Sequence, residues 1–179
     1  MRRLLATLAL AALALAAQRP AVVTREEMTT VEKYVDRSIR GLNVDDPFDL
    51  LGFTRGVYLP GYGVVFTAEV NLVVTPITPF HQAPVGSQLE RLHQKKLQRI
   101  KVVRELMRDS LVEAAATLDP VPANEKVVFG MTLFYRAFEI RQGLPGQIIM
   151  QAPKQKLLDY KANRIGKEQL EAAIQVQEL

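Results

Sequence analysis

At 179 residues, with 23 Lys and Arg against 19 Asp and Glu, the chain has room for one ordinary domain. A hydrophobic content of 48% is enough for a packed core and argues against a disordered or collagen-like chain. Because the sequence contains no cysteine, disulfides, thiolate metal sites and a cysteine nucleophile are excluded.

The first seventeen residues have the three parts of a secretory signal peptide. Arg2 and Arg3 form a cationic start, an apolar run covers residues 4–17, and Ala14-Leu15-Ala16 is an A-x-A cleavage pattern. A helix of 14 residues spans about 21 Å, which is shorter than the hydrocarbon core of about 30 Å. We therefore expect residues 1–17 to be removed and residues 18–179 to form one exported domain, periplasmic or extracellular in a bacterium.

A helix is predicted over residues 24–41. Thr24 and Glu27 fit a capping box, and Gly41 is a plausible residue after the helix end. Apolar residues recur at three- and four-residue spacing: Met28, Val31, Tyr34, Val35 and Ile39.

A β-hairpin is predicted over residues 55–75. Pro60-Gly61 suits the two central positions of a turn, since proline presets its φ and glycine accepts a positive φ. After the turn, apolar residues alternate along the chain: Val64, Phe66, Ala68, Val70, Leu72 and Val74. This strand should have one fully apolar face.

A long helix is predicted over residues 87–118, opened by a second capping box of Ser87 and Glu90. Its apolar stripe contains Leu89, Leu92, Ile100, Val103, Met107, Leu111, Ala114 and Leu118. At about 45 Å the helix is longer than a domain of this size requires, so we expect it to cross the sheet and overhang it. The overhang would suit self-association, and a homodimer is a possible assembly.

The remainder of the chain repeats this scheme. A second hairpin is predicted over residues 126–152, with a first strand whose alternation continues to Phe138 and a turn at residues 144–146. Residues 153–179 should form C-terminal helices and an edge strand. The expected fold is α+β: an antiparallel sheet of four to five strands built from two hairpins, with one long helix and shorter helices packed on it.

The long helix is also the most basic part of the chain. Residues 91–108 contain seven basic side chains and one acid, among them Arg91, Lys95 and Arg99, and Lys96 intrudes into the apolar stripe. Such a helix could bind a protein partner or an anionic surface outside the cytoplasm. Alternatively, Glu26, Glu27, Asp45 and their neighbours balance its charge. Because the chain is expected to be exported, no nucleic-acid partner is expected.

Two further charges lie near the middles of the predicted long strands. If those strands are neighbours, Glu69 and Arg136 could meet over an apolar floor and form a ligand site, with Glu69 as an acid/base candidate. The alternative is a partly buried salt bridge. The chain has no dinucleotide fingerprint, Walker loop, G-x-S-x-G or H-E-x-x-H motif, and its oxygen-rich turn at residues 43–49 lacks calcium-loop spacing. The catalytic residues are thus unknown, and no metal or cofactor is expected.

The stretch Tyr58-Leu-Pro-Gly-Tyr-Gly-Val-Val-Phe-Thr-Ala-Glu-Val70, together with the segment Lys156-Leu-Leu-Asp-Tyr and the later Gly166-Lys-Glu-Gln-Leu, resembles a group of exported bacterial proteins of unknown function. The resemblance implies export and a bacterial source, and it implies no activity. The sequence therefore predicts a non-enzymatic envelope module that binds through its long basic helix. The alternative is a small periplasmic ligand-binding protein or hydrolase that uses the sheet face around Glu69 and Arg136.

Overall fold

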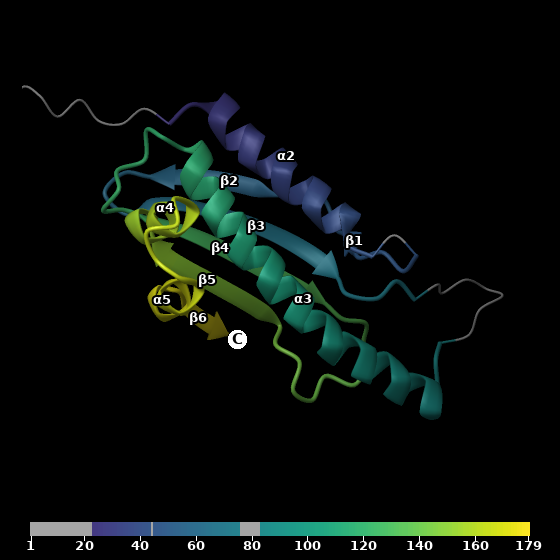
Figure 1. Ribbon diagram of the computed structural model, residues 1–179. Helices are drawn as coiled ribbons and strands as arrows, with labels where there is room; N and C mark the ends of the chain where they lie inside the picture. Colours follow the sequence, from purple (N-terminus) through teal and green to yellow (C-terminus); the bar gives the residue numbers. More distant parts are fainter. Residues whose placement is uncertain (1–22, 44, 76–82) are drawn as a thin grey trace, which may run out of the picture.

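The computed structural model describes residues 23–43, 45–75 and 83–179, and the predicted signal peptide lies outside these residues. Four helices and six strands occur in this part of the chain (Figure 1). The helices are α2 (Arg25–Gly41), α3 (Ser87–Thr117), α4 (Lys154–Lys161) and α5 (Lys167–Ala173). The strands are β1 (Asp49–Leu50), β2 (Arg55–Leu59), β3 (Gly63–Asn71), β4 (Lys126–Phe134), β5 (Gln147–Pro153) and β6 (Gln175–Glu178). The α+β class is confirmed.

The sheet has the order β1-β3-β4-β5-β6, and β2 pairs with the same edge of β3 as β1 does. Both predicted hairpins exist, because β2 and β3 are antiparallel and so are β4 and β5. The prediction of a purely antiparallel sheet of four to five strands is wrong, because there are six strands and β3 and β4 run parallel. The reason is α3, whose 31 residues carry the chain about 46 Å back across the sheet. β4 therefore starts at the same end as β3 and must run in the same direction.

All four helices lie on one face of the sheet (Figure 1). The alternation predicted for β3 is confirmed: Val64, Phe66 and Val70 are buried beneath the helices, whereas Thr67 and Glu69 are exposed. Within the described residues, no helix covers the opposite face. None of the described helices is both long and apolar enough to cross a bilayer.

The amino-terminal half of α3 extends beyond the ends of the strands, where the β4–β5 connection, residues 135–146, lies beside it (Figure 1). His93 Nδ1 is 3.1 Å from the carbonyl oxygen of Ile140. Met107 and Leu111, further along the helix, are fully buried in the core. The chain itself thus covers the stripe that was expected to reach a second copy.

Two predicted boundaries are wrong. Gly86 rather than Ser87 precedes α3, and no side chain caps that end; the Ser87 hydroxyl instead accepts a hydrogen bond from Arg91. β4 ends at Phe134 and not at residue 138, because the chain turns away there to pack against α3. The capping box of Thr24 and Glu27 is confirmed.

Candidate functional site

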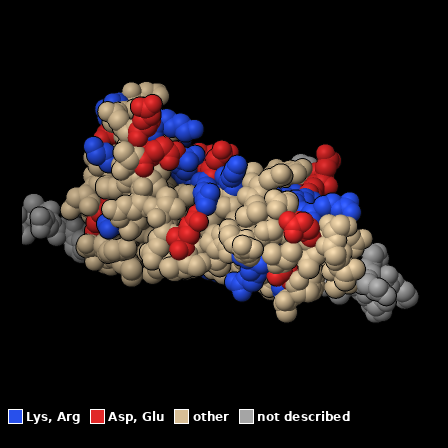
Figure 2. All heavy atoms as spheres, turned by 90° about the horizontal axis from the view of Figure 1, so that it is seen from below, with Lys and Arg blue, Asp and Glu red and all other residues tan. Residues whose placement is uncertain are grey.

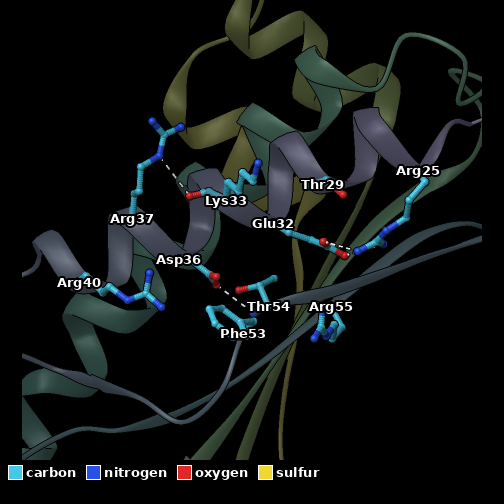
Figure 3. Close-up of a pocket in the computed structure, with 10 residues that line it drawn as sticks. All are labelled: Arg25, Thr29, Glu32, Lys33, Asp36, Arg37, Arg40, Phe53, Thr54 and Arg55. Carbon is cyan, nitrogen blue, oxygen red and sulfur yellow. Dashed lines mark hydrogen bonds and ion pairs between the residues drawn. The ribbon is translucent and has the colours of Figure 1, made fainter.

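A groove of about 460 Å³ lies between α2 and the segment that leads into β2 (Figure 3). This volume is in the range of small-ligand sites. The residues that line the groove come from one side of α2 and from residues 53–55: Arg25, Thr29, Glu32, Lys33, Asp36, Arg37, Arg40, Phe53, Thr54 and Arg55. The sequence analysis predicted none of them as a site.

Two buried carboxylates of α2 form the floor of the groove and hold the edge of β2. Glu32 Oε1 accepts a hydrogen bond of 2.8 Å from the Gly56 amide. Asp36 Oδ1 accepts one of 2.9 Å from the Thr54 amide. Positions i and i+4 of a helix are about 6 Å apart, and alternate residues of a strand are separated by nearly the same distance, so both bonds form at once. These acids satisfy outward-facing amides at the start of β2, and this also blocks pairing by another strand.

The rim of the groove is cationic. Arg25 pairs with Glu32 at 2.6 Å. The other four cations of the groove have no acidic partner within the described ranges: Lys33, Arg37, Arg40 and Arg55. With five cations and two carboxylates, the groove has an excess of three positive charges. Because the carboxylates are occupied by amides and by Arg25, the unpaired cations remain available to an anion.

An exposed aromatic ring lies between two of these cations. Phe53 is 62% exposed. The guanidinium carbon of Arg40 is 5.7 Å from the ring centroid, and that of Arg55 is 5.9 Å from it. These contacts orient both guanidinium groups beside an apolar surface. The Thr54 hydroxyl oxygen, in the same wall, is buried and has no hydrogen-bond partner among the described atoms. The groove can therefore bind both an anionic group and an apolar body.

The long helix differs from this groove, because acids of other elements occupy most of its cations. Lys95 and Arg99 both pair with Asp46. The hydrogen bond from Lys95, with a further contribution from Arg99, lowers the pKa of Asp46. Arg99 is buried and also donates to the carbonyl oxygen of Leu72. Of the three predicted binding residues on α3, only Arg91 is exposed without an acidic partner.

The other cations of α3 follow the same pattern. Lys96 pairs with Glu139, Arg104 with Glu178 and Arg108 with Glu171. Charge balance was the alternative interpretation of this helix. Of the acids expected to provide it, Asp46, the neighbour of Asp45, pairs with Lys95 and Arg99, whereas Glu26, Glu27 and Asp45 form no ion pair with the helix in the described structure. Figure 2 shows Lys and Arg atoms beside Asp and Glu atoms, with uncharged surface between such groups. This view contains no extended patch of one sign.

The structure does not bring Glu69 and Arg136 together. Glu69 is opposite Thr132 on β4 and is exposed on the open face of the sheet. Arg136 lies four positions beyond Thr132, after the strand has ended, and its guanidinium group is 6.0 Å from the ring centroid of Phe134. No acid/base site forms between them.

The sequence did contain a pattern that could have indicated the groove. Lys33, Arg37 and Arg40 recur at i, i+4 and i+7, so they lie along one face of α2. Glu32 and Asp36 occur at i and i+4 beside the apolar stripe, where acids are unusual unless they are paired. The contribution of Phe53 and Arg55 could not be read in this way, because their place beside α2 depends on the docking of β2.

Comparison of the chain with protein-family profiles, with curated protein sequences and with solved structures finds no match. In the part of the chain that the structure describes, no group of three His, Asp or Glu residues is placed to hold a metal ion. The chemistry of the groove residues is therefore the basis for a functional proposal.

Proposed function

We propose that the protein is an exported, non-enzymatic module of the bacterial cell envelope that binds an acidic segment of a partner protein in the groove between α2 and β2. The observation that carries the proposal is a set of four cations without acidic partners around the exposed Phe53. The cations of α3 support it less well, because most of them already pair with carboxylates of the same chain.

The shape of the groove favours a protein segment over a membrane surface. A concave site of about 460 Å³ accommodates a few side chains, whereas a flat headgroup layer would contact only its rim. Glutamate or aspartate carboxylates would pair with Arg37 and Arg40, and an adjacent apolar side chain would pack on Phe53. Arginine suits this role because its planar group binds a carboxylate through two parallel hydrogen bonds.

We expect the double substitution Arg37→Glu and Arg40→Glu to weaken binding of a fluorescein-labelled hexaglutamate peptide by roughly tenfold or more, since two exposed charge pairs are lost and two repulsions are introduced. Fluorescence anisotropy at low ionic strength measures this. Binding to the unsubstituted protein should also fall on addition of salt, because the screening length decreases from about 10 Å at 0.1 M to about 3 Å at 1 M.

The matched control is Arg91→Glu with Lys101→Glu, which makes the same change in net charge on exposed positions of α3. Peptide binding should be unchanged in this variant. If the control loses binding and the groove variant keeps it, α3 is the binding element and the groove proposal fails. Binding to phosphatidylglycerol vesicles without binding to the peptide would replace the protein partner with a lipid surface.

Export is tested separately. When the chain is expressed in a bacterium, we expect the mature protein in the envelope fraction to begin at Ala17 or Gln18, because the A-x-A pattern ends at Ala16. Amino-terminal sequencing of the purified protein measures the cleavage point. A stable protein that retains Met1 and remains in the membrane fraction would contradict it.

A further inference from the structure

The face of the sheet opposite the helices is open and carries few charges. In the strand register, one row of this face runs across the sheet from β2 to β6 and contains Val57, Val65, Val128, Gln151 and Gln175. The neighbouring row contains Thr67, Gly130, Ile149 and Gln177, with Arg55 at its β2 edge. Val57 is 51% exposed. A sheet face of valine, isoleucine, threonine and glutamine is suited to contact with another surface more than to free exposure.

Two opposite charges lie at the two ends of this face. Glu69 is near the end of β3, and Lys126 is at the start of β4, where it is opposite Gly63. Glu69 forms no ion pair in the described structure, and Lys126 contacts only the Gln151 amide oxygen at 3.4 Å and the Tyr62 ring. Six residues of strand separate the two positions, which corresponds to about 20 Å.

We propose that this face packs against the same face of a second copy of the chain, with the strands of the two copies antiparallel. A two-fold axis that crosses the strands places the Glu69 end of each sheet over the Lys126 end of the other. Packed sheets lie about 10 Å apart, a distance that a glutamate and a lysine span together. The face is thus complementary to itself at its two ends, where an ion pair forms, and Arg55 is the one charge in the two rows between them.

The area of the face indicates a weak dimer. Five strands at about 4.8 Å and seven residues at about 3.3 Å give about 550 Å² for each copy. The total of about 1,100 Å² is close to the lower limit of about 1,000 Å² for specific interfaces. We therefore expect association in the micromolar range, with a large contribution of the terminal ion pairs to its specificity.

Sedimentation velocity over a range of protein concentrations tests the arrangement. The purified chain should pass from monomer to dimer as its concentration rises. Glu69→Lys alone and Lys126→Glu alone should each weaken the dimer by tenfold or more, because each places like charges opposite one another at both ends. The double variant Glu69→Lys with Lys126→Glu should restore the dimer dissociation constant to within about threefold. In this variant opposite charges again face each other, with their positions exchanged.

Glu168→Lys on the exposed surface of α5 is the matched control, and it should leave the dimer unchanged. Circular dichroism of each variant shows whether it is folded. A monomer at all concentrations up to the millimolar range would overturn the proposal and leave the face to a different partner. Failure of the double variant to recover the dimer would overturn the antiparallel arrangement. The Arg37→Glu and Arg40→Glu variant should dimerise normally, so this result is independent of the peptide-binding experiment.

Discussion

Replacement of Glu139 with alanine is expected to lower the free energy of unfolding by about 3–5 kcal/mol, because it leaves the ammonium group of Lys96 buried without its counter-ion. The side chains of Lys96 and Glu139 are 1% and 2% exposed. The other contacts of the ammonium group are Asn71 Oδ1 at 3.4 Å, the Phe134 carbonyl oxygen at 3.5 Å and the Tyr135 ring at 4.9 Å from its centroid. Neutral contacts of this length do not replace a carboxylate. Urea denaturation measures the loss.

The stability of this variant should also depend on pH. Burial is the main cause that lowers the pKa of Lys96 from its ordinary value of 10.5, and Glu139 opposes that effect. Without Glu139 the pKa of Lys96 falls further. Between the lowered pKa and 10.5 the unfolded chain binds more protons than the folded one, so stability rises with pH in this window. We expect the thermal midpoint of Glu139→Ala to increase towards pH 10.5 more steeply than that of the unsubstituted protein.

Two controls separate the buried charge from other effects. The double variant Lys96→Met with Glu139→Leu should recover at least half of the lost stability, because it removes both charges and keeps the volume filled. Glu113→Ala breaks the exposed pair with Lys161, whose side chains are 34% and 51% exposed, and should cost only about 0.2–1 kcal/mol. Equal losses for Glu139→Ala and Glu113→Ala would contradict the interpretation.

Gly63→Ala is expected to lower the free energy of unfolding by about 3 kcal/mol or more, since steric overlap of about 1–3 kcal/mol adds to a backbone penalty of about 1–2 kcal/mol. Gly63 has a φ of +138°, and a Cβ atom on it would lie 1.9 Å from the carbonyl oxygen of Lys126. This contact is at the start of the parallel pairing of β3 and β4. The substitution must therefore push the two central strands apart. Thermal or urea unfolding measures the effect.

Gly61→Ala, two residues earlier in the turn that leads into β3, is the control. Gly61 has a φ of +80°, and no atom lies within 4 Å of its hypothetical Cβ atom. Only the backbone penalty of about 1–2 kcal/mol applies there. If both variants lose the same stability, the close approach of Gly63 to Lys126 has no energetic effect and the prediction fails.

The tertiary structure explains why a lysine interrupts the apolar stripe of the long helix. Lys96 lies within the apolar stripe of the long helix, and a buried lysine requires a partner. The partner, Glu139, is 43 residues away, in a connection that was expected to be strand for part of its length. A second buried lysine, Lys154, donates to the carbonyl oxygens of Leu118 and Val121 beyond the end of α3. Burial lowers its pKa.

The sequence by itself determined the α+β class, the two hairpins, the capped start of α2 and the alternation along β3. These features depend on turn chemistry and on periodicities of 2 and 3.6 residues, which act between positions a few residues apart. Only the tertiary structure decided that β3 and β4 run parallel, that the cations of α3 are paired, and that the groove lies beside α2. Each of these depends on strand order, register and the rotation of a helix about its axis. These features determine which distant residues meet, such as Arg104 and Glu178, which are 74 positions apart. No local sequence pattern encodes such a contact.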